Sequence, residues 1–230
     1  MKTPIIGILA GMGPRSTAPF IDLLVSECQR QYGARDDIDF PPIMVYSLPT
    51  PFYADRPIDH AAMEAALHAG LADLGRAGAD FMAIACNTAH IYYPALARQA
   101  PAPLLNMVAL TAEALPATAA KVALIAARPT VESGIYQEAI ADRGCQCIDL
   151  GWQDDVDTMI ESLRGELDAA SLSDRWNAFA TQARNAGADT IVVACADLSA
   201  VSVPLDMPVV DATHALASEI IGRWLRSRRA

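Results

Sequence analysis

Two cysteines occupy matching positions in this chain of 230 residues. The segment GADFMAIAC ends at Cys86, and the segment GADTIVVAC ends at Cys195, 109 residues later. Each cysteine closes a short apolar run that predicts a buried strand, at the point where a helix is expected to begin. Free N–H groups and the positive end of the helix dipole at such a point lower the pKa of a thiol. The two cysteines are therefore candidates for proton-transfer chemistry.

Two like thiols in related halves suit the inversion of a carbon centre. Inversion needs a base on one face of the carbon and an acid on the other, so a thiolate can remove a proton while an opposing thiol supplies one. A serine hydroxyl is a far weaker acid and would not serve easily. The alternative is that Cys86 and Cys195 are small buried hydrophobic residues, a common role for cysteine. Their matched positions favour the catalytic interpretation, provided that the two thiols flank one cleft.

The other three cysteines give weaker signals. Cys28 is expected in the middle of a helix, and Cys145 and Cys147 form a C-x-C pattern within a predicted strand. The chain has only 4 histidines, none with the spacing of metal ligands, so no metal site is expected. We expect the 5 cysteines to be thiols rather than disulfides.

Short apolar runs alternate with longer amphipathic runs in the first half. This alternation predicts a parallel sheet covered by helices. The proline-rich segment Leu48–Pro57 is expected to be a loop. The expected strands are Ile5–Ala10, Ile43–Ser47, Phe81–Ala85 and Leu104–Asn106, and the expected helices are Pro14–Gly33, Ala61–Ala77 with Asp59 as cap, and Thr88–Gln99.

The same order recurs in the second half. IIGILAGMGPRST is echoed by KVALIAARPT, and APLLNM by MPVVDA, in the same order as the two cysteine segments. The chain is therefore predicted to be an α/β protein of two pseudo-symmetric domains, each a mostly parallel sheet flanked by helices, with the active site in the interdomain cleft. The predicted domains are residues 1–107 and 108–211, joined near Met107–Ala120, and the helix 212–226 is expected to pack back on the first domain.

Composition excludes several classes of function. With 17 Lys+Arg against 27 Asp+Glu, the formal net charge of −10 argues against nucleic acid as a partner. No apolar run approaches the ~18 residues of a membrane span, and the N-terminal sequence lacks the pattern of a signal peptide, so a cytoplasmic location is expected. Hydrophobic residues make up 53% of the chain. Those on the helices could serve a homodimer interface, although the core explains them equally well.

The motifs as a set resemble one family. GMGP at Gly11–Pro14, ACNTAH at Ala85–His90, PTVESGIY at Pro129–Tyr136 and the second cysteine resemble the aspartate/glutamate racemase family over nearly the whole chain, closest to its aspartate racemase branch. The resemblance implies a racemase that works without a cofactor on aspartate, glutamate or a related amino acid. It also implies that Cys86 and Cys195 are the acid/base pair.

The same resemblance implies roles for further residues. Asn87 and Thr88 resemble the residues that hold the α-carboxylate of the substrate, as an amide and a hydroxyl beside helix N–H groups can do. Met12 would line the cleft. Thr130 would offer a second hydroxyl, or else act only as a helix cap. His90 is expected to support its motif structurally.

Two arginines resemble residues that reach an acidic side chain of the substrate. They are Arg56 in ADRP and Arg164 before Gly165, and a guanidinium can bind a carboxylate in bidentate fashion. The alternative for each is a solvated surface charge. The loop around Arg56 departs from the family pattern, since Phe52 and Tyr53 stand among its prolines.

The second cysteine stands in an altered context. The family usually has Gly-Cys-Thr-Glu there, whereas this chain has Ala194, Cys195, Ala196 and Asp197. Ala196 lacks the threonine hydroxyl, and Asp197 is one carbon shorter than glutamate. The second half of the site is therefore expected to accept a different substrate or to work more slowly.

Other chemistries fit less well. A pyridoxal enzyme needs a well-placed lysine, and only Lys2 and Lys121 are present. GMGP lacks the third glycine of a dinucleotide-binding motif, and thioester-forming amidases need a histidine base. The alternatives that stay open are another enzyme of the superfamily, such as a hydantoin racemase or a maleate cis–trans isomerase, and a catalytically idle protein that binds a small molecule. An arylmalonate decarboxylase would keep a single catalytic cysteine, so the pair argues against it.

Overall fold

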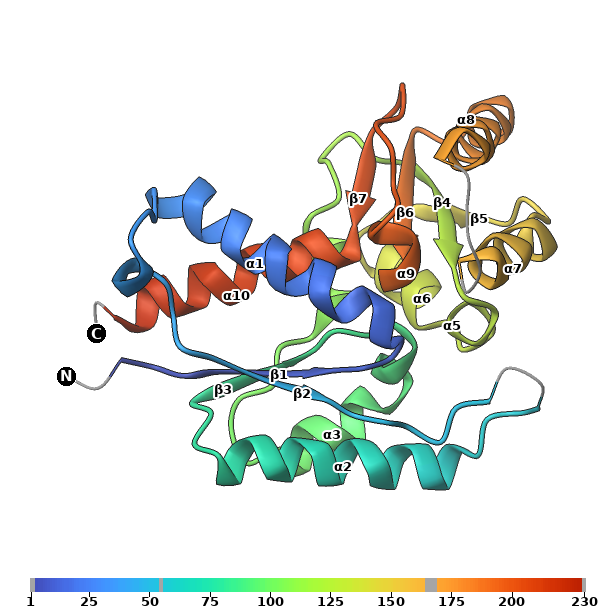
Figure 1. Ribbon diagram of the computed structural model, residues 1–230. Coiled ribbons are helices and arrows are strands. Elements are labelled where there is room, and N and C mark those ends of the chain that lie inside the picture. Colours follow the sequence, from blue (N-terminus) through green and yellow to red (C-terminus); the bar gives the residue numbers. More distant parts are fainter. Residues whose placement is uncertain (1–2, 54–55, 164–168, 229–230) are drawn as a thin grey trace. The chain divides into compact units, whose positions relative to one another are not determined.

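The computed structural model describes residues 3–53, 56–163 and 169–228 (Figure 1). The chain divides into two compact units. The first unit comprises residues Met1–Met107 and Leu216–Ala230, and the second unit comprises Val108–Ala215. Among the described residues each unit contains one parallel sheet flanked by helices, which confirms the predicted fold class. The limits of the predicted domains, 1–107 and 108–211, stay a prediction.

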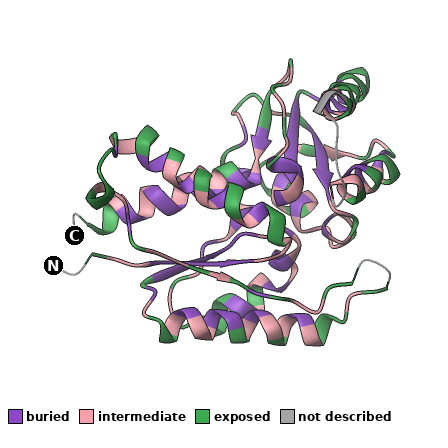
Figure 2. Cartoon of the chain, in the orientation of Figure 1, coloured by how far each residue is buried: buried purple, intermediate pink, exposed green. Residues whose placement is uncertain are grey.

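The sheet of the first unit brings three strand ends to one edge. All strand pairs are parallel, with Ala10 opposite Ser47 and Leu9 opposite Ile84. The central strand, β1 (Ile6–Ala10), and β3 (Phe81–Ile84) are buried along their whole length, as strands covered on both faces must be (Figure 2). The outer strand β2 (Ile43–Ser47) is partly exposed. In spatial order the strands are β2 (Ile43–Ser47), β1 (Ile6–Ala10) and β3 (Phe81–Ile84).

Helices cover both faces of this first sheet. Figure 1 shows α2 (His60–Arg76) and α3 (Tyr93–Gln99) on one side, and α1 (Thr17–Tyr32) with α10 (Ala212–Ser227) on the other. The Asp59 side chain caps α2, as predicted, by accepting a hydrogen bond from the Ala62 amide at 3.0 Å.

The C-terminal helix contacts the N-terminal segment and α1. The indole Nε1 of Trp224 donates to the carbonyl oxygen of Pro4 at 3.1 Å, and its ring lies 5.8 Å from that of Tyr32. The side-chain amide of Gln31 donates to the carbonyl of Ser218 at 2.8 Å. These contacts attach the part of α10 from residue 216 onward to the first unit.

The sheet of the second unit repeats the strand order of the first. Its first strand in the chain lies between its second and third, as in the first unit, and all pairs are parallel. In the first unit a single bridge between Met82 and Leu104 stands where the second unit has a fourth strand. The common order agrees with the duplication read from the sequence. In spatial order the strands are β5 (Gln146–Ile148), β4 (Lys121–Ala126), β6 (Thr190–Ala194) and β7 (Val209–Asp211).

Aromatic side chains form much of the core on one face of this second sheet. Trp176 and Phe179 of one helix pack with Trp152 against the buried residues of β4 and β6. The rings of Trp152 and Phe179 meet edge to face at 5.2 Å. The α-helices that lie wholly or mostly in the described part of this unit are α4 (Met107–Glu113), α5 (Arg128–Glu132), α6 (Ile135–Asp142), α7 (Gln153–Ser162), α8 (Ala169–Asn185) and α9 (Ala196–Ser199).

Three predicted elements differ from the structure. The expected helix Pro14–Gly33 opens as a 3₁₀ helix, η1 (Pro14–Ser16), before α1 begins at Thr17. The segment Thr88–Gln99 is a 3₁₀ helix, η3 (Thr88–Tyr92), followed by α3, and not one α-helix. Pro94 has no N–H to continue an α-helical ladder from the preceding turn, and the Tyr93 amide bonds to the carbonyl of His90 in 3₁₀ fashion. The expected strand Leu104–Asn106 is reduced to the bridge at Leu104.

Among the described residues, we find no helix that combines the length and the apolar character needed to cross a membrane.

Candidate active site

The turn after β1 depends on a glycine. Gly11 has φ +95°, and a Cβ at this position would lie 2.7 Å from both the amide nitrogen and the carbonyl oxygen of Leu48. The Gly11 amide donates to Oγ1 of Thr17 at 3.2 Å. Only glycine accepts this conformation without strain while the backbones lie so close. The turn therefore delivers the next residue, the half-buried Met12, to the edge where the strands end.

Cys86 lies two residues beyond β3 at the same edge. The Ala85 amide still bonds to the carbonyl of Leu9 at 2.9 Å, so the chain leaves the sheet at the cysteine itself. The side chains of Cys86 and Met12 pack against the same apolar core cluster and are both half-buried. The structure thus brings together two of the residues predicted for the site.

Asn87 and Thr88 continue from the cysteine. Asn87 is the N-cap residue of η3 and is buried, whereas Thr88 opens this short helix and is half-buried. The first unit therefore places Met12, Cys86, Asn87 and Thr88 at the carboxyl end of its sheet, where ligands bind in open α/β folds.

His90 is buried beside the cysteine, and backbone groups occupy both nitrogens of its ring. Nδ1 lies 2.8 Å from the carbonyl oxygen of Cys86, and the amide of Met107 donates to Nε2 at 3.1 Å. Since Nε2 accepts, the proton sits on Nδ1, which donates to Cys86. Burial lowers the pKa of His90 to about 4, so the ring is neutral near pH 7. With both nitrogens engaged, His90 is not a base for the thiol, as an amidase of the cysteine–histidine type would require.

Arg56 lies on the loop that follows β2. Its side chain is exposed, and its guanidinium lies 4.3 Å from the centre of the Tyr53 ring. This cation–π contact involves one of the residues that depart from the family pattern in this loop. Arg164, the other arginine predicted to reach the substrate, lies outside the described residues.

Cys195 directly follows β6 in the second unit. It is 9% exposed, and its carbonyl accepts a hydrogen bond from the main-chain amide of Ser199 at 2.9 Å. Asp197 stands half-buried in the first turn of α9. The helix expected at this cysteine is only four residues long. The dipole argument for a lowered thiol pKa is correspondingly weaker than the sequence suggested.

Thr130 lies at the same edge of this second sheet. Ala126, the last residue of β4, pairs with Ala194, and Thr130 follows in α5. Its side chain is completely buried. The N-cap of α5 is Ala127, so the interpretation of Thr130 as a helix cap is wrong.

Asp211 is a residue that the sequence analysis missed. It ends β7 opposite Val193, and its Oδ1 accepts hydrogen bonds from the amides of Thr213 at 2.8 Å and His214 at 3.1 Å. Burial raises the pKa of its carboxyl group, although the nearby Ser199 hydroxyl lowers it in part. The available signal was the echo of APLLNM in MPVVDA, which puts Asn106 and Asp211 at matching positions.

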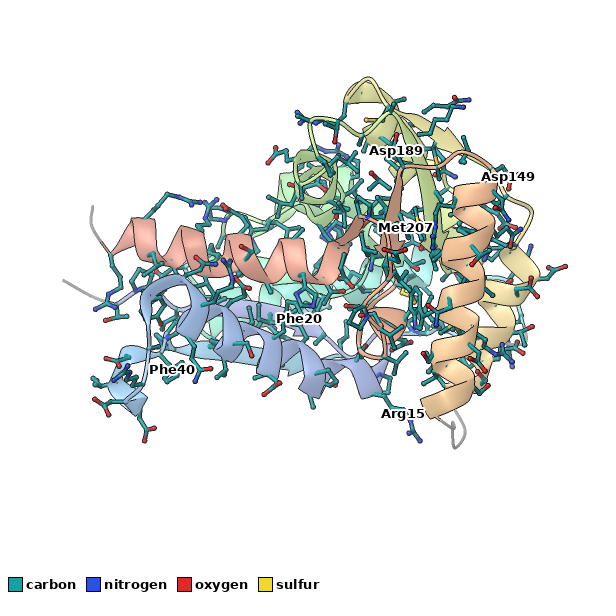
Figure 3. The ribbon with its side chains drawn as sticks, turned by 90° about the horizontal axis from the view of Figure 1, so that it is seen from above. Arg15, Phe20, Phe40, Asp149, Asp189 and Met207 are labelled. Atoms are coloured by element: carbon teal, nitrogen blue, oxygen red, sulfur yellow. The ribbon has the colours of Figure 1, made fainter. Side chains whose placement is uncertain are left out.

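A cavity lies beside Asp211. Its volume is about 360 Å³, and its walls come from α8, β6, β7 and the segment before β7, on which Figure 3 labels Met207. Most of its lining is apolar, including Trp176 and Val193, and the polar residues Ser202, Asp211 and His214 complete it.

The remaining cysteines are held as thiols. Burial raises the pKa of Cys28, and it raises the pKa of Cys147 to about 11. The thiol of Cys145 donates to the carbonyl of Ala119 at 3.3 Å. In the part of the chain that the structure describes, no group of three or more His, Cys, Asp or Glu side chains is placed to hold a metal ion.

Comparisons with known proteins cover nearly the whole chain. A family model described as Asp/Glu/Hydantoin racemase matches residues 9–220. The broad specificity amino-acid racemase RacX of Bacillus subtilis (strain 168) is 39% identical over 224 residues, which cover 96% of this chain and 98% of the relative.

Solved structures of racemases also resemble this chain. The Picrophilus torridus aspartate racemase superposes with a TM-score of 0.72 at 26% identity, covering 96% of this chain and 94% of its own. A putative Asp/Glu racemase from Yersinia pestis reaches a TM-score of 0.77 at 22% identity, covering 96% of this chain and 99% of its own, and shows the likeness of fold.

Proposed function

We propose a reaction for this chain from the premise that it belongs to the Asp/Glu/hydantoin racemase family and is an amino-acid racemase. The family resemblance carried by GMGP, ACNTAH and PTVESGIY is thereby confirmed. The proposed reaction inverts Cα of aspartate, glutamate or a related amino acid, without a cofactor, by means of the two thiols of Cys86 and Cys195.

One observation carries the assignment of the thiols. Each cysteine leaves the sheet at the carboxyl end of the third strand of its unit, and the two sheets have the same strand order. Cys28 and Cys147, in contrast, have pKa values raised by burial, and so stay protonated. The two strand-end cysteines are set apart from Cys28 and Cys147 by their matching positions in the two sheets.

The proposed mechanism is a proton exchange between sulfur and carbon. The thiolate of one cysteine takes the proton from Cα, so that a C–H bond breaks and an S–H bond forms. The thiol of the other cysteine then gives its proton to the opposite face of the planar carbanion. The roles reverse for the other enantiomer, and the scheme requires Cys86 and Cys195 to flank the same carbon in a cleft.

Substrate binding is assigned to residues around the cysteines. Asn87 and Thr88 would hold the α-carboxylate, with Met12 and Thr130 lining the site. Arg56 and Arg164 would bind an acidic side chain, where one is present. The relative at 39% identity is named for broad specificity, and Ala196 removes a hydroxyl beside Cys195. We therefore extend the proposed substrates beyond the two acidic amino acids.

The direct test is exchange at Cα. Each L- and D-amino acid is incubated with the protein in D₂O, without added cofactor, and followed by NMR. For a true substrate, we expect the product to carry deuterium at Cα, whether the reaction starts from the L- or the D-enantiomer. Product without deuterium would contradict proton abstraction. Turnover of maleate or of a hydantoin alone would select one of the superfamily alternatives, and binding without any exchange would select the idle binding protein.

Cysteine variants test the two-base scheme. Cys86→Ser and Cys195→Ser are each expected to lower racemisation by about 10³-fold, since each removes one of the two proton carriers. Cys147→Ser is the matched control, because burial keeps that thiol protonated, and it is expected to retain the wild-type rate. Substantial racemisation by either of the first two variants would refute the scheme.

Location and assembly belong to the same proposal. We propose that the protein lies in the cytoplasm, where its free cysteines would stay reduced. We also propose that it forms a homodimer. Sedimentation velocity would distinguish the 24.5 kDa monomer from the dimer.

A further inference from the structure

We propose that His90 is a positioning residue for Cys86: its imidazole fixes the peptide group between Cys86 and Asn87, and through it the direction of the thiol and of the Asn87 amide. The kinetic part of this inference rests on the proposed function. Its structural part rests on contacts within the first unit alone.

The first step is the hydrogen bond to the cysteine itself. Nδ1 of His90 donates to the carbonyl oxygen of Cys86 at 2.8 Å, which pins one end of the peptide plane. This peptide is trans, so its C=O and N–H point in opposite directions. The Asn87 amide must therefore point away from His90. A rotation of this plane would turn the amide and would also change the backbone angles of Cys86, on which the position of Sγ depends.

The second step is that the imidazole is itself immobile. The Met107 amide donates to Nε2 at 3.1 Å, and the Tyr93 ring stacks on the imidazole with centres 5.8 Å apart and planes 8° apart. The Tyr93 hydroxyl in turn donates to the carbonyl of Leu104 at 3.1 Å. His90 thus connects the end of β3 to the segment that follows the Leu104 bridge, and cannot rotate without breaking both hydrogen bonds.

The third step is that the imidazole keeps one proton. Burial lowers its pKa to about 4, so Nδ1 donates and Nε2 accepts throughout the neutral range. His90 can therefore hold the peptide without competing for the proton that Cys86 would transfer.

The local backbone explains why a side chain is needed here. In η3 the His90 amide bonds to the carbonyl of Asn87, so the main chain at position 90 does not serve the carbonyl of Cys86. The equivalent carbonyl, that of Cys195, accepts from the main-chain amide of Ser199 and needs no such side chain.

Amide side chains can replace the two nitrogens of His90 separately. In His90→Asn the amide N–H lies near the position of Nδ1 and can still donate to Cys86. In His90→Gln the amide oxygen lies near the position of Nε2 and can still accept from Met107, but the bond to Cys86 is lost. His90→Leu removes both. Ser199→Ala is the matched control in the other unit, because the main-chain bond to Cys195 survives it. Trp224→Phe controls for loss of stability, since it removes a hydrogen bond to Pro4 far along the chain.

Two readouts report on Cys86. One is the pH profile of its alkylation by iodoacetamide, measured peptide by peptide by mass spectrometry. The other is the separation of kcat from KM in racemisation. We expect His90→Asn to retain the alkylation profile and a kcat within about 5-fold of wild type. We expect His90→Gln and His90→Leu to shift the profile and to lower kcat by about 10- to 100-fold, since small misplacements of a reacting group have effects of this size.

The outcomes separate positioning from mere stability. Equal losses in His90→Asn and His90→Gln, or losses that follow thermal stability as in Trp224→Phe, would overturn the proposal. A wild-type protein without racemisation or Cα exchange would refute the proposed function instead. The alkylation profiles would still decide the role of His90, because they need no substrate.

Discussion

The carbonyl oxygens of the two strand-end cysteines are satisfied in different ways. That of Cys86 accepts from the imidazole of His90, and that of Cys195 accepts from the main-chain amide of Ser199. In both cases the partner is four residues further along the chain. The backbone requirement is the same, since a buried carbonyl needs a hydrogen bond. In the first unit the donor is the side chain of His90, which a substitution can remove. In the second unit the donor is a main-chain amide, which a substitution of Ser199 leaves in place.

The turns after the first strands differ in a parallel manner. The first unit uses Gly11 with φ +95°, packed against the backbone of Leu48. The second unit uses Ala127 with φ −60°, an ordinary extended conformation. At its strand ends the first unit therefore depends on particular residues, Gly11 and His90, whereas the second unit uses ordinary backbone angles and a main-chain hydrogen bond.

The largest expected effect tests this difference at the turns. Gly11→Ala adds a Cβ at positive φ and 2.7 Å from backbone atoms, so we expect it to lower the free energy of unfolding by about 3–4 kcal/mol. Ala127→Gly adds only flexibility, with an expected loss of about 0.5–1 kcal/mol. Urea denaturation of both variants gives the comparison. Equal losses would show that the two turns are equally tolerant.

A smaller effect concerns pH and His90. Its pKa is about 4 in the folded protein against 6.5 for an unperturbed histidine, so the unfolded chain binds the extra proton first. The neutral imidazole thus contributes stability that is present above pH 6.5 and is lost as the pH falls toward 4. Relative to His90→Asn, the free energy of unfolding of the wild type should fall by about 3 kcal/mol between pH 7 and pH 4.

Denaturation curves at several pH values measure this dependence. Trp224→Phe, which changes no titratable group, should stay parallel to the wild type over the same range. A wild-type curve parallel to that of His90→Asn would mean that the imidazole is not buried in its neutral form.

The smallest effect belongs to the second unit and has the opposite sign. Burial raises the pKa of Asp211 in the folded protein, so its ionisation costs stability as the pH rises from about the unfolded value upward. Asn accepts the same backbone hydrogen bonds about as well as Asp does, so the free energy of unfolding of Asp211→Asn should match that of the wild type at low pH and exceed it near neutrality. If the free energy of unfolding of Asp211→Asn fell relative to that of the wild type as the pH rose, the raised pKa would be contradicted.

Local sequence signals predicted much of the fold. Ile43–Ser47 is a strand with the predicted limits, Asp59 caps α2, and Gly33 ends α1 with φ +71°. These features depend on neighbours in the chain, such as apolar runs, capping groups and positive φ. The repeat of GADFMAIAC also indicated the common strand order, because similar segments fold alike.

Other features depended on contacts that distant residues make. The sequence suggested that His90 supports its motif, but the identity of its partners follows from the meeting of η3 with Met107. Asp211 was missed because the burial that raises its pKa is a result of tertiary packing. The short helices after both cysteines were also unforeseen. The segment after Cys86 is divided into η3 and α3, with Pro94 near the start of α3, and α9 after Cys195 has only four residues.

The sequence by itself determined the family, the class of fold and the two candidate thiols, because motifs and periodicity are properties of the chain. Tertiary structure alone decided how each cysteine is held. The hydrogen bond of a carbonyl, the tautomer of His90 and the protonation of Asp211 depend on which groups folding brings within 3 Å or so and on how far it excludes water. Such distances have no counterpart in the order of residues.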